Sequence, residues 1–262
     1  MSVDIRNAQV KNLNVGPTIV TEGLLAGWNA ASVHSYPRTG SVWYDLGRNQ
    51  NNGSLINMSA DNFTDDGGGA LTFDGTDEYV SIPHDPSIDF GTGSFTVFLW
   101  FKPDPTLISS NYVIGKRGTT AGGGNYSGWS INIGVSLSTW SPSNVIIDDG
   151  STTVSSVGTF SIPIGWVSIA FTYNSVSRLF TFSTVSDSAQ GLVGYTPVGF
   201  GSIANTVPLE MMGTKYYNHV YDYNNFYEGC QGRVANVVIY DRVLTNDELY
   251  ENYASTRSRF EE

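Results

Sequence analysis

The segment at residues 94–101 carries apolar side chains on both faces of an expected β-strand. One face is formed by Phe95, Val97, Leu99 and Phe101. The opposite face holds Phe98 and Trp100. Because successive side chains of a strand point to opposite faces, this strand must be covered on both sides. The sequence therefore predicts a central strand inside a layered β-structure.

Shorter strand signals recur around this segment, with turn residues between them. They lie at residues 71–73, 79–82, 166–173, 178–184 and 233–240. The first two flank Asp74-Gly75-Thr76-Asp77, and an Asp-Gly pair tolerates the positive φ that a tight hairpin turn requires. Many short strands with few helix signals are typical of an all-β, two-sheet antiparallel sandwich.

The clearest helix signal lies near the end of the sequence. Thr245 and Glu248 have the spacing of a capping box, in which each side chain bonds to the backbone of the other residue. Leu244 and Leu249 occupy the staple positions around this cap. The pattern predicts one short C-terminal helix at about residues 246–255.

The chain length of 262 residues fits a single sandwich domain. All-β sandwiches often run to roughly 200–250 residues around one core. Residues 1–20 are polar and weakly patterned, so we expect them to form an arm or a linker. Residues 21–262 are the expected domain.

The chain is acidic, since 24 Asp and Glu residues against 13 Lys and Arg residues give a net charge of −11. Phosphate binding needs a basic patch, so nucleic acid is not an expected partner. The longest apolar run, at residues 97–101, is far shorter than the ~20 residues of a membrane-spanning helix, and we expect no membrane insertion. The first residues lack the pattern of a secretory signal peptide. The single cysteine, Cys230, argues against an internal disulfide.

Four segments resemble, in order, parts of laminin G-like, concanavalin A-like jelly-roll domains. Residues 71–80 are similar to the characteristic strand pair of this family, which has a Phe-Asp-Gly turn followed by Tyr-Val. The opening, the central tryptophan strand and the closing strand match residues 43–55, 165–173 and 232–245. The resemblance covers about residues 22–260 and implies a jelly-roll sandwich with one short C-terminal helix.

Residues 24–30, together with a short helix ending near Phe260, look most like the versions of this domain carried by tailed-bacteriophage virion proteins. That likeness implies a non-enzymatic structural protein of a fibre, capsid decoration or tail, located on the virion surface. The implied partners are other virion subunits, further copies of the chain in a homo-oligomer, and host-surface glycans. The same fold serves lectins and glycosidases, so a calcium-assisted carbohydrate-binding module and a glycosidase stay open as alternatives.

The sequence shows no catalytic pattern. A retaining glycosidase needs two carboxylates about 5–5.5 Å apart, which on one strand calls for alternating acidic positions. The acidic pairs at residues 65–66, 148–149 and 247–248 are adjacent instead, so on a strand they would point to opposite faces. The three histidines, at positions 34, 84 and 219, lack zinc-ligand spacing. We therefore expect no enzyme activity.

A stretch at residues 215–227 combines six aromatic side chains with Asn and Asp and shows no strand alternation. Aromatic rings cover the apolar faces of sugars while polar groups bond to hydroxyls, and the same mixture anchors protein interfaces. The candidate glycan or interface residues are Tyr126, Trp140, Tyr216, Tyr217, Tyr221 and Tyr223. The alternative is that these rings only pack on the sandwich.

Calcium is the cofactor that the resemblance implies, because related sandwiches hold it through carboxylates and loop carbonyls. Asp74 and Asp77, at the hairpin turn, are the candidate ligands, and the pairs at residues 65–66 and 148–149 are alternatives. A simpler interpretation is that the Asp74 carboxylate accepts backbone N–H groups and only stabilises the turn.

Overall fold

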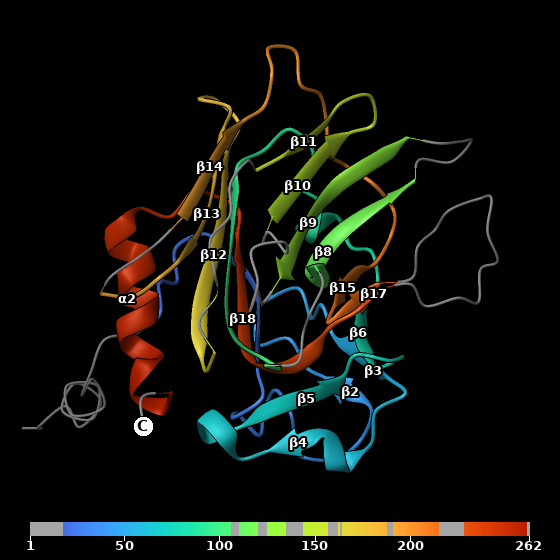
Figure 1. Ribbon diagram of the computed structural model, residues 1–262, viewed down its shortest axis with the longest axis vertical. Helices are drawn as coiled ribbons and strands as arrows, with labels where there is room; N and C mark the ends of the chain where they lie inside the picture. The colour runs from blue at the N-terminus through green and yellow to red at the C-terminus, as the bar shows by residue number, and fades with distance from the viewer. Residues whose placement is uncertain are drawn as a thin grey trace, which may run out of the picture.

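The computed structural model describes residues 18–105, 110–119, 125–134, 144–156, 162, 164–187, 191–214 and 228–260. In this part of the chain two antiparallel sheets pack against each other, and helix α2 (Asn246–Thr256) lies beside one of them (Figure 1). The predicted all-β sandwich with one short C-terminal helix is confirmed.

The first sheet, sheet A, carries the helix on its outer face. Its strands follow the order β14 (Gly191–Tyr195), β13 (Leu179–Thr184), β12 (Val167–Asn174), β7 (Phe95–Pro103), β18 (Gln231–Tyr240), β5 (Ala70–Asp74) and β4 (Phe63–Thr64). Strand β1 (Leu24–Asn29) pairs with the C-terminal half of β18.

The second sheet, sheet B, closes the other side of the sandwich. Its strands follow the order β11 (Thr153–Ser155), β10 (Asn144–Asp149), β9 (Tyr126–Gly134), β8 (Ser110–Thr119), β15 (Leu209–Met211), β6 (Tyr79–Ile82), β3 (Gly53–Ile56) and β2 (Val42–Trp43). Two short strands, β16 (Gly213–Thr214) and β17 (Glu228–Gly229), form a separate pair. The short 3-10 helices are η1 (Ala60–Asn62), η2 (Asp66–Gly68), η3 (Pro86–Ile88) and η4 (Arg257–Arg259).

Strand β7 is covered on both faces, as the sequence predicted. Its inward side chains, Phe95, Val97, Leu99 and Phe101, are fully buried in the core between the sheets. On the outer face, Phe98 and Trp100 are buried with residues of α2. The Trp100 ring stacks on Phe260, with 4.2 Å between ring centroids, and on Tyr253 at 5.7 Å. One helix therefore covers the apolar outer face of the central strand.

The predicted capping box at the start of α2 is present. The Thr245 hydroxyl accepts the Glu248 N–H at 3.3 Å, and the Glu248 carboxylate accepts the Thr245 N–H at 2.8 Å. Hydrogen bonds from the Arg242 guanidinium, above all, lower the pKa of Glu248 to about 2. The helix is 11 residues long. No helix within the described ranges is long and apolar enough to span a bilayer.

Residues 1–17 of the expected arm lie outside the described residues. Its last residues already contact the sandwich. The Val20 N–H donates to the Asn252 side-chain oxygen at 2.8 Å, and the Val20 carbonyl accepts the Tyr240 hydroxyl at 3.0 Å. The expected division of the chain at residue 20 stays a prediction.

A buried lysine lies inside the sandwich, where no local pattern predicted one. The Lys116 side chain is 2% exposed and shares the inner face of sheet B with Trp129. Its ammonium donates to Asn205 Oδ1 at 2.8 Å, and Asp89 Oδ1 lies 3.8 Å away. Burial lowers the pKa of Lys116 to about 8, although the charge of Asp89 acts in the opposite direction.

The lowered pKa of Lys116 predicts a specific pH dependence of stability. Between about pH 8 and pH 10.5 the unfolded state binds more protons at this lysine than the folded state. The free energy of unfolding should therefore gain a contribution that rises with pH, by up to about 3 kcal/mol. Lys116→Met removes this contribution. The free energy of unfolding of the wild type minus that of the variant should therefore increase as pH rises across this window. Urea titrations at several pH values measure the difference, and parallel curves would contradict the assignment.

Candidate functional site

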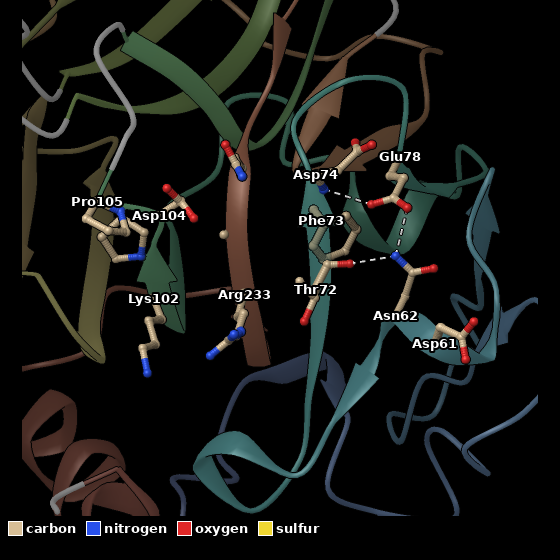
Figure 2. Close-up of a pocket in the computed structure, with 13 residues that line it drawn as sticks. Asp61, Asn62, Thr72, Phe73, Asp74, Glu78, Lys102, Asp104, Pro105 and Arg233 are labelled. Atoms are coloured by element: carbon tan, nitrogen blue, oxygen red, sulfur yellow. Dashed lines mark hydrogen bonds between the residues drawn. The ribbon is translucent and has the colours of Figure 1, made fainter.

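A pocket of about 320 Å³ opens on the outer face of sheet A, where no residue of α2 lines it (Figure 2). Its lining residues are Asp61, Asn62, Thr72, Phe73, Asp74, Glu78, Lys102, Pro103, Asp104, Pro105, Gln231, Gly232 and Arg233. Four of these side chains are carboxylates and two are cations, so the pocket offers both acceptors and donors of hydrogen bonds.

Strand pairing sets the charged side chains in two neighbouring rows. Lys102 of β7 lies opposite Arg233 of β18, and we call this pair the cationic row. Gln231, two residues before Arg233 on β18, lies opposite Asp74. The Gln231 carbonyl accepts the Asp104 N–H at 3.2 Å. Asp74 and Asp104 form the acidic row. Because residues two apart on a strand share a face, the rows lie side by side, about 7 Å apart.

One carboxylate from η2 holds the cationic row. Asp66 Oδ2 accepts hydrogen bonds from Lys102 Nζ at 2.8 Å and from the Arg233 guanidinium, while Oδ1 accepts the Trp166 indole N–H at 2.9 Å. Burial alone would raise the pKa of Asp66, but these three hydrogen bonds outweigh it and lower the pKa to about 2. Figure 2 shows Lys102 and Arg233 extending in the same direction from neighbouring strands. Asp66 takes one N–H donor from each cation. An ammonium has three donors and a guanidinium has five, so both side chains keep donors for a ligand.

Glu78 fixes the opposite wall of the pocket. Its carboxylate accepts the Asn62 amide at 2.8 Å and the Asp74 backbone N–H at 2.8 Å (Figure 2). The same Asn62 amide donates to the Thr72 carbonyl at 2.9 Å. These bonds tie η1 to β5 and to the turn that follows it. Glu78 is therefore a bracing group whose two oxygens are both engaged.

A glycine lets β18 pass close to β7 between the two rows. Gly232 has φ +156°, and a Cβ there would lie 2.6 Å from the Lys102 carbonyl oxygen. It would also lie 3.0 Å from the Phe101 ring. Any larger residue would push the strands apart, so this glycine preserves the register that aligns Lys102 with Arg233.

The two candidate calcium ligands have different surroundings. The Asp74 carboxylate lines the pocket and accepts the Thr76 N–H at 2.7 Å, as the simpler turn interpretation predicted. Asp77 is not a lining residue, and its carbonyl accepts the Asn57 amide at 3.0 Å. The described residues contain no group of three or more His, Cys, Asp or Glu side chains placed to hold a metal ion. Calcium binding at this turn stays a prediction.

Tyr126 is the single candidate aromatic residue among the described ones. It begins β9 in sheet B, and the Arg117 guanidinium lies 4.3 Å from its ring centroid. Arg117 also forms an ion pair with Asp148. The other candidates, Trp140, Tyr216, Tyr217, Tyr221 and Tyr223, lie outside the described residues. The segment at 215–227 is bounded by Thr214 and Glu228, which pair directly with each other.

Most of the pocket was not predicted from the sequence. Asp74 was singled out, but Lys102, Arg233 and Asp104 were not. The available signal was weak: a charged residue directly follows a strand that is apolar on both faces. Only the pairing of two strands far apart in the sequence shows that Lys102 and Arg233 belong together.

Sequence comparison identifies the family. The family model of the concanavalin A-like lectin/glucanases superfamily matches residues 74–249. That range is well over half of the 262 residues, and the chain belongs to this superfamily. No curated protein matches the chain.

Solved structures with the same fold include binding domains and enzymes. The binding domain of Paraclostridial Mosquitocidal Protein 1 has a TM-score of 0.57 at 14% identity, over 87% of this chain and 51% of its own. A Trypanosoma rangeli sialidase in complex with the inhibitor DANA has a TM-score of 0.58 at 14% identity, over 98% of this chain and 38% of the sialidase chain. Domain 4 of AbnA, a GH43 extracellular arabinanase from Geobacillus stearothermophilus, was solved in complex with arabinotriose. It has a TM-score of 0.54 at 14% identity, over 87% of this chain and 97% of its own. This chain spans about half or less of the first two structures, and the likeness shows the fold alone.

The role of Asp66 can be tested by its acid dependence. Asp66→Asn should lower the free energy of unfolding by about 2 kcal/mol at neutral pH, because the paired carboxylate has a pKa near 2 instead of its usual 3.8. This contribution is fully present above the pKa that Asp66 has in the unfolded chain and is lost as pH falls toward 2. The free energies of unfolding of wild type and variant should therefore converge in acid. The matched control is Asp65→Asn, whose carboxylate is 82% exposed and 3.8 Å from Arg38. Urea unfolding at pH 7 and near pH 2 measures both variants, and equal losses at the two positions would contradict the role of Asp66.

Proposed function

We propose that this chain is a non-enzymatic carbohydrate-binding domain and that the pocket on sheet A is its binding site. The observation that carries the proposal is the cationic row beside the acidic row. A sugar hydroxyl both donates and accepts hydrogen bonds, as a serine hydroxyl does. Adjacent hydroxyls of one sugar unit can therefore accept from Lys102 or Arg233 and donate to Asp74 or Asp104.

Binding without catalysis is supported by the way two of the four pocket carboxylates are used. Both oxygens of Glu78 accept hydrogen bonds from the protein, and Asp74 accepts the Thr76 N–H. A glycosidase needs two carboxylates free to act on opposite sides of the bond that breaks. Carboxylates that are already bonded to the protein, such as those of Glu78 and Asp74, are better suited to orienting a ligand than to catalysis. Among the structures with this fold, the arabinanase domain was solved with arabinotriose, which is in keeping with a binding role.

The pocket assignment can be tested with one conservative substitution. Asp74→Asn keeps an oxygen for the Thr76 N–H but removes the charge from the acidic row. Affinity for the best ligand from a printed oligosaccharide array should fall about tenfold or more, because hydrogen bonds to charged groups are worth ~1.5–3 kcal/mol. Asp77→Asn, in the same turn but outside the pocket, is the matched control and should bind as the wild type does. Isothermal titration calorimetry measures all three proteins.

The same titrations distinguish the alternatives. If Asp74→Asn binds normally while Tyr217→Ala or Tyr221→Ala does not, the site belongs to the aromatic segment. If a chelator abolishes binding and both aspartate variants weaken it, calcium takes part. New reducing ends in the bound oligosaccharide would show turnover and overturn the non-enzymatic assignment.

We further propose that the domain is displayed on a bacteriophage particle, as part of a fibre, decoration or tail. The support is the resemblance of residues 24–30, which contain the whole of β1, and of the C-terminal helix to phage versions of the domain. In that setting other virion subunits are its partners and host-surface glycans are its ligands. The chain should copurify with particles and label their surface with a specific antibody, and its absence from purified particles would overturn this assignment.

A further inference from the structure

Strand β14 is the most complete exposed edge of the two sheets. The other terminal strands are short, since β4 and β2 have two residues each and β11 has three. Strand β14 has five, all paired with β13 in an unbroken register. Within the described ranges, no hydrogen bond reaches its other side. By contrast, the outer side of β1 is covered. The Gly27 N–H donates to Asp45 Oδ1, and the Gly27 carbonyl accepts the Leu46 N–H, each at 2.8 Å.

This edge carries none of the features that usually block pairing with another chain. Natural edge strands are protected by charged residues, proline or a bulge. The sequence of β14 is Gly-Leu-Val-Gly-Tyr, with no charge, although the chain as a whole has a net charge of −11. Val193 is 53% exposed and Tyr195 is 66% exposed on the outer face. Two copies can therefore pair here without like charges facing each other along the strand, and with apolar area to bury.

The side chains of β14 are complementary to a second copy of the same strand. In antiparallel pairing centred on Val193, each Tyr195 lies opposite the Gly191 of the other copy. A large ring then meets a position with no side chain, an arrangement known to stabilise cross-strand glycines. On the inner face Leu192 meets Gly194, where the Phe180 ring already fills the space that a Cβ would take. Large and small residues thus alternate with two-fold symmetry.

We propose that two copies of this chain form a dimer by antiparallel pairing of their β14 strands, which joins the two A sheets into one. The interface is isologous, since the same strand contributes on both sides and the contact closes on itself. This inference is independent of the proposed sugar pocket, which is built by β5, β7 and β18.

The mass of the full-length chain in solution tests the dimer. Sedimentation equilibrium should give twice the 28.4 kDa of one chain. Val193→Lys places two ammonium groups opposite each other at the centre of the contact and should raise the dissociation constant at least about tenfold. Val176→Lys is the matched control: this valine is 91% exposed but lies in the β12–β13 turn, so the variant should dimerise normally. A single-chain mass at every concentration, or a dimer that withstands Val193→Lys, would overturn the proposal.

A cysteine cross-link tests the register without relying on a charged variant that might unfold. Directly opposed residues of an antiparallel pair have Cα atoms about 4.5–5.5 Å apart, within the range of a disulfide. Val193→Cys should therefore form a covalent dimer under mild oxidation, visible on a non-reducing gel. The natural Cys230 is buried and does not compete. Val176→Cys is the control, and cross-linking of Val193→Cys that is no faster than the control would overturn the register.

Discussion

The pairing of β7 with β18 is the constraint on which the rest of sheet A depends. Strand β18 borders β7 along one side and divides its other side between two partners, β5 at residues 231–234 and β1 at residues 236–240. A single register shift between Val234 and Asn236 accommodates the change of partner. The same strand therefore aligns the polar rows of the pocket at one end and secures the opening strand of the domain at the other.

The pocket and the C-terminal helix are linked through the loop that contains η2. Asp66 of this loop holds the cationic row and the Trp166 indole. The Trp166 ring in turn lies 4.9 Å from Phe260, which follows η4. Gly67 has φ +61°, and a Cβ there would lie 2.6 Å from the Phe260 ring, so only glycine fits beneath it. The site thus depends on contacts among five parts of the sequence, at residues 66–67, 102, 166, 233 and 260.

Local sequence patterns predicted the strands, the turn and the helix cap. They did not predict the features that depend on the pairing of segments far apart in the sequence. The two apolar faces of residues 94–101, the Asp74 turn and the Thr245 cap each follow from neighbouring residues, and all three appear in the structure. The alignment of Lys102 with Arg233 depends on strand register across more than a hundred residues. The burial of Lys116 depends likewise on which residues the opposite sheet and loops bring to it. Neither leaves a periodic signal in the sequence.

The order of strands in sheet A also bears on how strongly such a protein would hold a surface. The pocket lies on β7, β18 and β5, with β12 and β13 between it and β14. A dimer joined at β14 therefore keeps both pockets open, one toward each end of the shared sheet. On a surface dense in glycans, the proposed binding at the first pocket would raise the effective concentration of ligand at the second. Avidity of this kind lets an individually weak sugar site give firm attachment that a soluble monosaccharide competes against poorly.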